Sequence, residues 1–119
     1  MEAHDSPPVE VRDFGEPDDL LETPLRVART LKFGRGHAIL TRIEPGWSFR
    51  KDFQPHVGTQ WCQIDHFEYV ISGQLSVVTA EGQAYDVKPG DVMAIPPGHE
   101  GRVVGDKPFI TISLARREP

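Results

Sequence analysis

Turn-forming residue pairs divide the chain from residue 25 onward into short segments, and this spacing limits the possible folds more than any other feature. Each pair supplies residues that tight turns favour. The pairs are Pro45-Gly46, Ser72-Gly73, Glu81-Gly82, Pro89-Gly90, Pro97-Gly98 and Gly105-Asp106. The segments between them are apolar and β-branched, and none keeps a helical apolar spacing over three turns. The pattern predicts an all-β domain, a sandwich or barrel in which two sheets close over one core.

We predict ten short strands in this part of the chain. Their ranges are Leu25–Lys32, His37–Glu44, Trp47–Phe53, Thr59–Ile64, His66–Ser72, Gln74–Thr79, Gln83–Val87, Asp91–Ile95, Gly101–Val104 and Phe109–Ala115. Gly73 lies between two of these strands, where a tight hairpin needs a positive φ. Pro96 and Pro97 cannot continue a central strand, so the chain must leave the sheet there.

The first 24 residues differ in charge from the rest of the chain. From Met1 to Thr23 eight residues are acidic and only Arg12 is basic, and three prolines interrupt any periodicity. We interpret residues 1–24 as an acidic, proline-containing N-terminal arm and residues 25–116 as the folded domain. The arm could shield a sheet edge or reach a neighbouring subunit, or it could be a solvated tail.

Charge and cysteine content favour some functions over others. The net charge is -5 and no cluster of Lys and Arg could follow a row of phosphates, which disfavours nucleic acid as a partner. The single cysteine cannot form an intramolecular disulfide, and no apolar stretch is long enough to span a membrane. We therefore expect a cytoplasmic protein with no membrane partner.

Two stretches resemble the signature motifs of the cupin superfamily. They are HFEYVISGQLSVV, which begins at His66, and YDVKPGDVMAIPPGHE, which begins at Tyr85. In the second motif a glycine is followed, after five residues, by Pro-x-Gly, and Gly90, Pro96 and Gly98 match this spacing. The resemblance covers residues 25–115. It implies an all-β cupin fold, the double-stranded β-helix or jelly-roll barrel, and a homodimer, since cupins commonly pair.

The usual metal ligands of this superfamily are replaced. The motif spacing places the family's first two histidines at Gln60 and Cys62, its glutamate at His66 and its third histidine at Gly101. The resemblance therefore does not support the common iron or manganese site of three histidines and one carboxylate.

A different set of candidate ligands remains. Gln60 and Cys62 lie two apart on one predicted strand, and His66 and Glu68 lie two apart on the next, so each pair shares a face. His99 has the parity to face inward as well. A thiolate with two imidazoles suits zinc, copper or ferrous iron better than manganese or magnesium. Cys62 could instead be a core residue, His66 an interior histidine bonded to Glu68 or Gln60, and His99 a solvated turn residue.

A group of small cupins of unassigned activity is similar in more detail. Its pattern of Thr-x-x-Cys-x-x-x-His followed by Pro-Pro-Gly-His is matched here by Thr59, Cys62 and His66 and by residues 96–99. This resemblance implies that Cys62, His66 and His99 form one site, and it brings no known substrate.

These observations leave several functions open. In one, Cys62, His66 and His99 hold a divalent transition metal, Glu68 is a catalytic acid or base, and Gln60 lines a pocket for a small-molecule substrate. In another, the protein is a metal-free module that binds or senses a small molecule. In a third, it serves as a dimer partner through its apolar run at Phe109–Ile112.

Overall fold

The structure is a computed structural model that describes residues 8–116, so residues 1–7 of the predicted arm lie outside the described part. Three strands come first, β1 (Asp19–Thr23), β2 (Arg26–Phe33) and β3 (Gly36–Ile43). After a helical segment come β4 (His66–Ser72), β5 (Gln74–Thr79), β6 (Ala84–Val87), β7 (Val92–Ile95), β8 (His99–Val104) and β9 (Phe109–Arg116). The predicted all-β class is confirmed.

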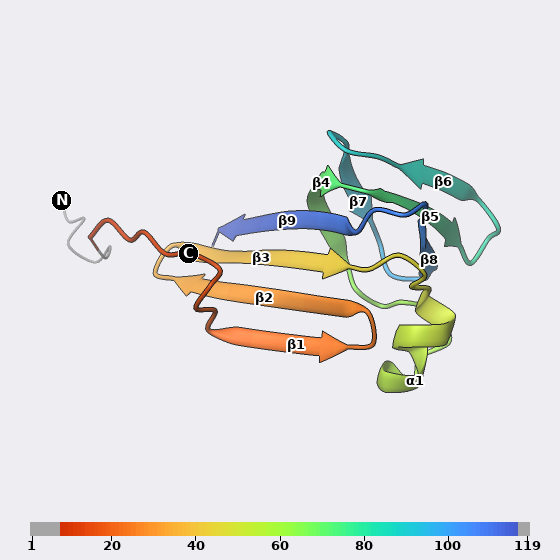
Figure 1. The fold of residues 1–119 in the computed structure, drawn as a ribbon, viewed down its shortest axis with the longest axis horizontal. Coiled ribbons are helices and arrows are strands. Elements are labelled where there is room, and N and C mark those ends of the chain that lie inside the picture. The colour runs from red at the N-terminus through yellow and green to blue at the C-terminus, as the bar shows by residue number, and fades with distance from the viewer. Residues whose placement is uncertain (1–7, 117–119) are drawn as a thin grey trace.

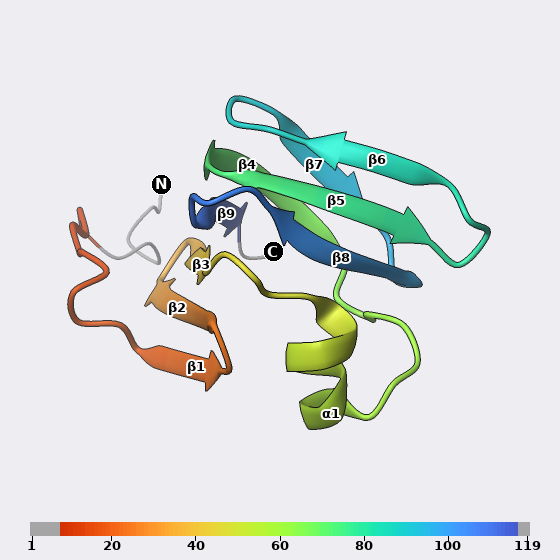
Figure 2. The same ribbon diagram turned by 45° about the vertical axis from the view of Figure 1, so that its right-hand side comes forward.

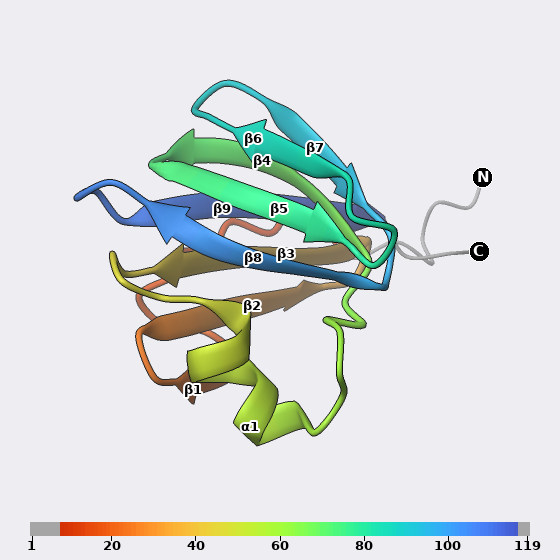
Figure 3. The ribbon, with the colours of Figure 1, turned by 90° about the vertical axis from the view of Figure 1, so that its right-hand side faces the viewer.

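The strands form two antiparallel sheets that face each other, as seen along the long axis of the molecule in Figure 3. The larger sheet has the strand order β1-β2-β3-β9-β4-β7, and the smaller has the order β6-β5-β8. The smaller sheet lies over one end of the larger one, and β1, β2, β3 and β9 extend beyond it (Figure 1). The two sheets therefore enclose the interior at one end only.

Buried and exposed side chains alternate along the strands of the larger sheet, which gives the sheet an inner and an outer face. In β4, His66, Glu68 and Val70 turn inward, whereas Phe67 and Tyr69 are exposed. Residues directly opposite one another on paired strands share a face, and Val70 is opposite the buried Thr111 of β9. The inner face carries the apolar core and, at one position, a cluster of polar side chains.

The core joins both sheets to the helical segment. Its buried members are Ile43, Trp47, Phe49, Phe53, Cys62, Val70, Leu75, Val77, Val87, Met93, Val103 and Phe109. The β4–β5 hairpin fixes the position of the second sheet. Gly73 adopts a φ of +79°, and a Cβ at that position would lie 2.3 Å from the carbonyl oxygen of Pro108. Only glycine fits this turn, as the sequence predicts.

The prediction of a strand at Trp47–Phe53 is wrong. Residues Phe49–Phe53 form a π-helical turn that continues into α1 (Gln54–Val57), which lies beside the two sheets in Figure 2. The Ser48 hydroxyl accepts a hydrogen bond from the Lys51 backbone N–H, and the Asp52 carboxylate accepts one from the Ser48 backbone N–H. This reciprocal capping favours a helix start. Phe49 and Phe53, four residues apart, then both enter the core.

The predicted strand at Thr59–Ile64 is also wrong, because this segment is irregular. Within residues 8–116, its only ladder contact is a bridge in which Cys62 N–H donates to the His99 carbonyl and Gly98 N–H donates to the Cys62 carbonyl. Strand β8 begins at His99, two residues before the predicted start at Gly101. Within the predicted arm, Asp19–Thr23 forms β1 and pairs with β2.

Candidate metal centre

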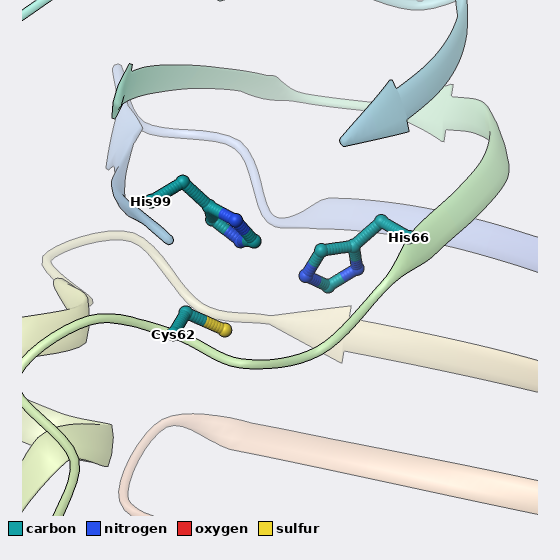
Figure 4. Close-up of side chains that lie close together, drawn as sticks. All are labelled: Cys62, His66 and His99. Atoms are coloured by element: carbon teal, nitrogen blue, oxygen red, sulfur yellow. The ribbon is translucent and has the colours of Figure 1, made fainter. Parts of the chain in front are cut away.

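Three segments bring Cys62, His66 and His99 together. Cys62 lies in the irregular segment that precedes β4, His66 is the first residue of β4, and His99 is the first residue of β8. The thiol sulfur and one nitrogen of each imidazole all lie within 4.8 Å of one another. Figure 4 shows the three side chains pointing toward one another. The backbone bridge between Cys62 and His99 holds two of them in register.

Both histidine rings are oriented by a hydrogen bond at Nδ1. His66 Nδ1 lies 2.5 Å from a Glu68 carboxylate oxygen, and the other Glu68 oxygen accepts a hydrogen bond of 2.7 Å from the Thr111 hydroxyl. His99 Nδ1 donates to the Pro96 carbonyl oxygen at 2.8 Å. With Nδ1 engaged, Nε2 of each ring is the nitrogen left for another partner. Metal-binding histidines are characteristically held in this way, with a carboxylate or carbonyl behind the ring.

Cys62 has the properties of a thiolate. Burial raises the pKa of its thiol, but the adjacent His66 and His99 rings and the Ile64 backbone N–H lower it by more, and the resulting pKa is about 6 against an ordinary value of 9.0. A thiolate is the form of cysteine that binds metal ions.

The charges around the thiolate are coupled. Burial lowers the pKa of His66, but the Cys62 thiolate and the Glu68 carboxylate raise it by more, to about 9. Burial raises the pKa of Glu68, and the His66 and Thr111 contacts lower it below its ordinary value. Glu68 is therefore a carboxylate at neutral pH, and each of its oxygens already has a partner.

A small cavity adjoins these residues. Its volume is about 40 Å³, and its wall includes Cys62, His66, Glu68 and His99 together with core side chains. One water molecule needs roughly 10–15 Å³ of such space, so this cavity fits a few waters or one small chemical group. Ligand pockets for whole drug-sized molecules are about 300–1,000 Å³.

Gln60 does not reach this cavity. It is exposed and is not one of the residues that line the cavity, because the strand expected at Thr59–Ile64 does not form and the predicted alternation therefore fails. The prediction that Gln60 lines the substrate pocket is corrected accordingly. Cys62 points inward even so, since its bridge to His99 sets its direction.

Three further residues contribute to the site and are not predicted from the sequence. Thr111 bonds Glu68, the Pro96 carbonyl orients His99, and Arg26 lines the cavity. Arg26, Ala28 and Thr30 alternate with Val27, Arg29 and Leu31 along β2, and both sets contain one arginine. No local signal distinguishes the inner set from the outer one.

The donor set fits a divalent transition metal. Zinc binds sulfur at about 2.3 Å and nitrogen at about 2.0–2.1 Å, so a sulfur and a nitrogen that bind one tetrahedral ion lie roughly 3.6 Å apart. The three donor atoms lie within 4.8 Å of one another, and side-chain rotations toward their common centre would bring them to this separation. One thiolate and two imidazoles suit zinc, ferrous iron or copper.

The fold and this cluster define a small two-sheet β-barrel with a cluster of ligand-type side chains inside it. The chain belongs to the cupin family, because the profile of the cupin domain matches residues 39–114, more than half of its length. A comparison with curated proteins gave no match.

Solved structures of low sequence identity share the fold. Ectoine synthase from P. lautus is 18% identical with a TM-score of 0.61, over 87% of this chain and 76% of that one. A protein of unknown function from Acidithiobacillus ferrooxidans is 17% identical with a TM-score of 0.58, over 82% of this chain and 87% of that one. One of unknown function from Acinetobacter sp. ADP1 is 13% identical with a TM-score of 0.53, over 84% and 98%. At these identities the comparison supports the fold alone.

Among residues 8–116, the structure has no helix with the length and apolar character needed to cross a membrane.

Proposed function

We propose that this cupin binds one divalent transition-metal ion, zinc, iron or copper, through Cys62, His66 and His99, and acts as a metal-dependent enzyme on a small molecule. The observation that carries the proposal is the convergence of the three donors with both histidine Nδ1 atoms already hydrogen-bonded. When bound, such an ion supplies Lewis-acid chemistry and can acidify a water.

The surrounding residues would hold the ligand side chains in position for the metal. Glu68 holds His66 through Nδ1, and Thr111 fixes the second oxygen of Glu68. We therefore propose Glu68 as a positioning residue, in place of the acid or base role expected from the sequence. The Pro96 carbonyl does the same for His99, and the core side chains around the cavity exclude bulk water. The small volume of the cavity argues against the alternative of a metal-free module that encloses a whole ligand.

The metal content of tag-free protein, measured by mass spectrometry, tests this proposal. We expect near-stoichiometric metal in the wild type and its loss in Cys62→Ser, His66→Ala and His99→Ala. His56→Ala is the matched control, because His56 is exposed on α1 and outside the cavity. Metal that is absent from the wild type, or that is indifferent to the three substitutions, would refute the proposal.

We also propose that a second copy of the chain covers the outer face of the larger sheet. Phe67, Tyr69, Val92 and Leu114 are all exposed there, and Tyr69 lies opposite Val92 and Ile112 on the neighbouring strands. Contiguous apolar surface of this kind is typical of an interface. We also propose a cytoplasmic location, supported by a cysteine content of one, which provides no intramolecular disulfide.

A further inference from the structure

Two buried hydrogen-bond donors in the cavity wall have no acceptor. Within residues 8–116, three buried side-chain nitrogen or oxygen atoms lack a hydrogen-bond partner, and two of them belong to cavity-lining residues: Arg26 Nη1 and Trp47 Nε1. Trp47 is only 7% exposed. The Arg26 guanidinium lies over the Phe53 ring, 4.7 Å from its centroid, and Trp47 packs against the same ring at 6.5 Å between centroids.

The chemistry of these donors restricts what could satisfy them. Arginine and the tryptophan indole can donate hydrogen bonds but cannot accept them, so their partner must offer acceptor atoms. Leaving buried donors unpaired is costly, which makes such groups uncommon in folded proteins. Glu68 is the nearby carboxylate, but its hydrogen bonds are to His66 and Thr111, and it accepts none from Arg26 Nη1 or Trp47 Nε1. The planar guanidinium matches a carboxylate better than any other common anion except phosphate.

The formal charge of the site also favours an anion, and this step rests on the proposed function. A divalent ion bound by one thiolate and two neutral imidazoles carries a net charge of +1. The charges of Glu68 and Arg26 cancel. One buried positive charge is then uncompensated, and a single carboxylate would neutralise it.

A small cavity and a larger groove adjoin each other here. The cavity could hold the charged group of a ligand and the groove the rest of it. The cavity of about 40 Å³ has room for one small group. Five residues, Arg26, Thr41, Ile64, His66 and Glu68, line both this cavity and a groove of about 290 Å³.

Apolar side chains supply much of the groove's surface. Leu20 and Leu21 of β1, Ala28 of β2 and Ile39 of β3 contribute to it, beside charged residues that include Asp19 and Asp65. The strands that line it, β1, β2, β3, β4 and β9, all belong to the larger sheet. An apolar body would find apolar contacts there, next to the donors in the cavity.

We propose that the substrate is a small organic monocarboxylate with an apolar body, whose carboxylate pairs with Arg26 and Trp47 while its body occupies the groove. Strand β1, from the acidic N-terminal segment, is then one wall of the substrate site. The competing explanation is that Arg26 only balances the charges of Cys62 and Glu68, in which case no carboxylate is selected.

Butyrate and its neutral isostere butyramide are suitable probes. We would titrate each into zinc-loaded and chelator-treated protein and follow the Trp47 indole N–H and the Arg26 side-chain N–H by NMR. The prediction is saturable butyrate binding that moves both signals and is at least about tenfold tighter than butyramide binding to the zinc-loaded protein. Equal affinities, or no butyrate binding, would overturn the proposal.

Variants assign the effect to the two donors. Arg26→Gln should weaken butyrate binding about tenfold or more, and Trp47→Phe, which keeps a ring but removes the N–H, should weaken it a few-fold. Arg42→Gln removes the same charge from an exposed arginine paired with Glu44 and should leave binding unchanged. If Arg26→Gln does not fold, Trp47→Phe and the amide comparison still decide the question.

Measuring zinc retention and butyrate binding together shows whether the carboxylate site or the metal site is refuted. Zinc retention without preference for butyrate would refute the carboxylate site and leave the metal site standing. Butyrate binding that depends on Arg26 in a protein that retains no zinc would refute the metal site and leave the carboxylate site standing.

Discussion

For single residues, the hydrogen bonds already made by the two histidines determine which of their nitrogens are free to bind a metal. His66 and His99 both use Nδ1 for a protein acceptor, and Cys62 lies beside both rings with a pKa of about 6. A cysteine that only filled the core would not need two imidazoles beside it. The cluster is thus built as a unit, with Glu68, Thr111 and Pro96 behind it.

Glu68→Gln tests the positioning role of the carboxylate. We expect zinc affinity to fall by about 10- to 100-fold, the usual effect of removing a carboxylate behind a metal-binding histidine. Competition with a chromophoric chelator measures this. Glu100→Gln is the control, because Glu100 follows His99 directly but pairs with Arg50. An equal loss in both variants would contradict the role of Glu68.

The ionisation of Cys62 can be followed directly, since the chain contains one cysteine. In chelator-treated protein, the ultraviolet absorbance of the thiolate should appear as the pH rises through about 6, well below the ordinary 9.0. In His66→Ala the midpoint should move up, because one of the rings that stabilises the thiolate is lost. A wild-type midpoint near 9 would show that the rings do not act on the sulfur.

Residue-level prediction succeeded where a motif fixed the spacing. The resemblance to small cupins grouped Cys62, His66 and His99, and the structure brings these three together. It failed for Gln60 and missed Arg26. Whether the side chains of Gln60 and Arg26 face inward depends on the path of the backbone around them. A local sequence pattern does not determine that path.

At the scale of elements, turn residues made most strands predictable from the sequence. Strands β3, β4, β5 and β9 lie within a few residues of their predicted ranges, since glycine and proline mark where each can end. The segment Trp47–Phe53 was misjudged because Trp47 and Phe49 alternate as in a strand. The segment is helical instead, because Ser48 and Asp52 cap a helix start and the four-residue spacing of Phe49 and Phe53 puts both rings in the core.

Gly73 in the β4–β5 turn and Gly82 in the β5–β6 turn offer a matched pair of substitutions. Gly73 and Gly82 both have a positive φ, +79° and +91°, but only at Gly73 would a Cβ collide with backbone. We expect Gly82→Ala to lower the free energy of unfolding by about 1–2 kcal/mol and Gly73→Ala to lower it by clearly more. Urea denaturation measures both. Equal losses would mean that the hairpin moves away from Pro108 at little cost.

At the scale of the whole molecule, two sheets of unequal size leave different surfaces. The space between the sheets contains the core and the candidate metal centre, and strands of the larger sheet line the groove beside it. The outer face of the larger sheet carries exposed aromatic and aliphatic side chains. Fold class and family follow from sequence motifs, whereas this distribution of surfaces depends on strand order across both sheets.

Sedimentation velocity tests the proposed dimer. Phe67 is 68% exposed and Leu114 is 72% exposed. We expect the wild type to sediment as a dimer and Phe67→Ser/Leu114→Ser to sediment as a folded monomer, because the exchange removes apolar area from the outer face. Val57→Ser, on the exposed end of α1, should not change the sedimentation. A monomeric wild type would rule out this use of the face.

X-ray absorption spectroscopy at the zinc edge of zinc-loaded protein would show whether Cys62 and two histidines bind one ion. We expect one sulfur at about 2.3 Å and nitrogen or oxygen neighbours at about 2.0–2.1 Å, with the sulfur lost in Cys62→Ser. A shell of nitrogen and oxygen alone in the wild type would contradict this expectation.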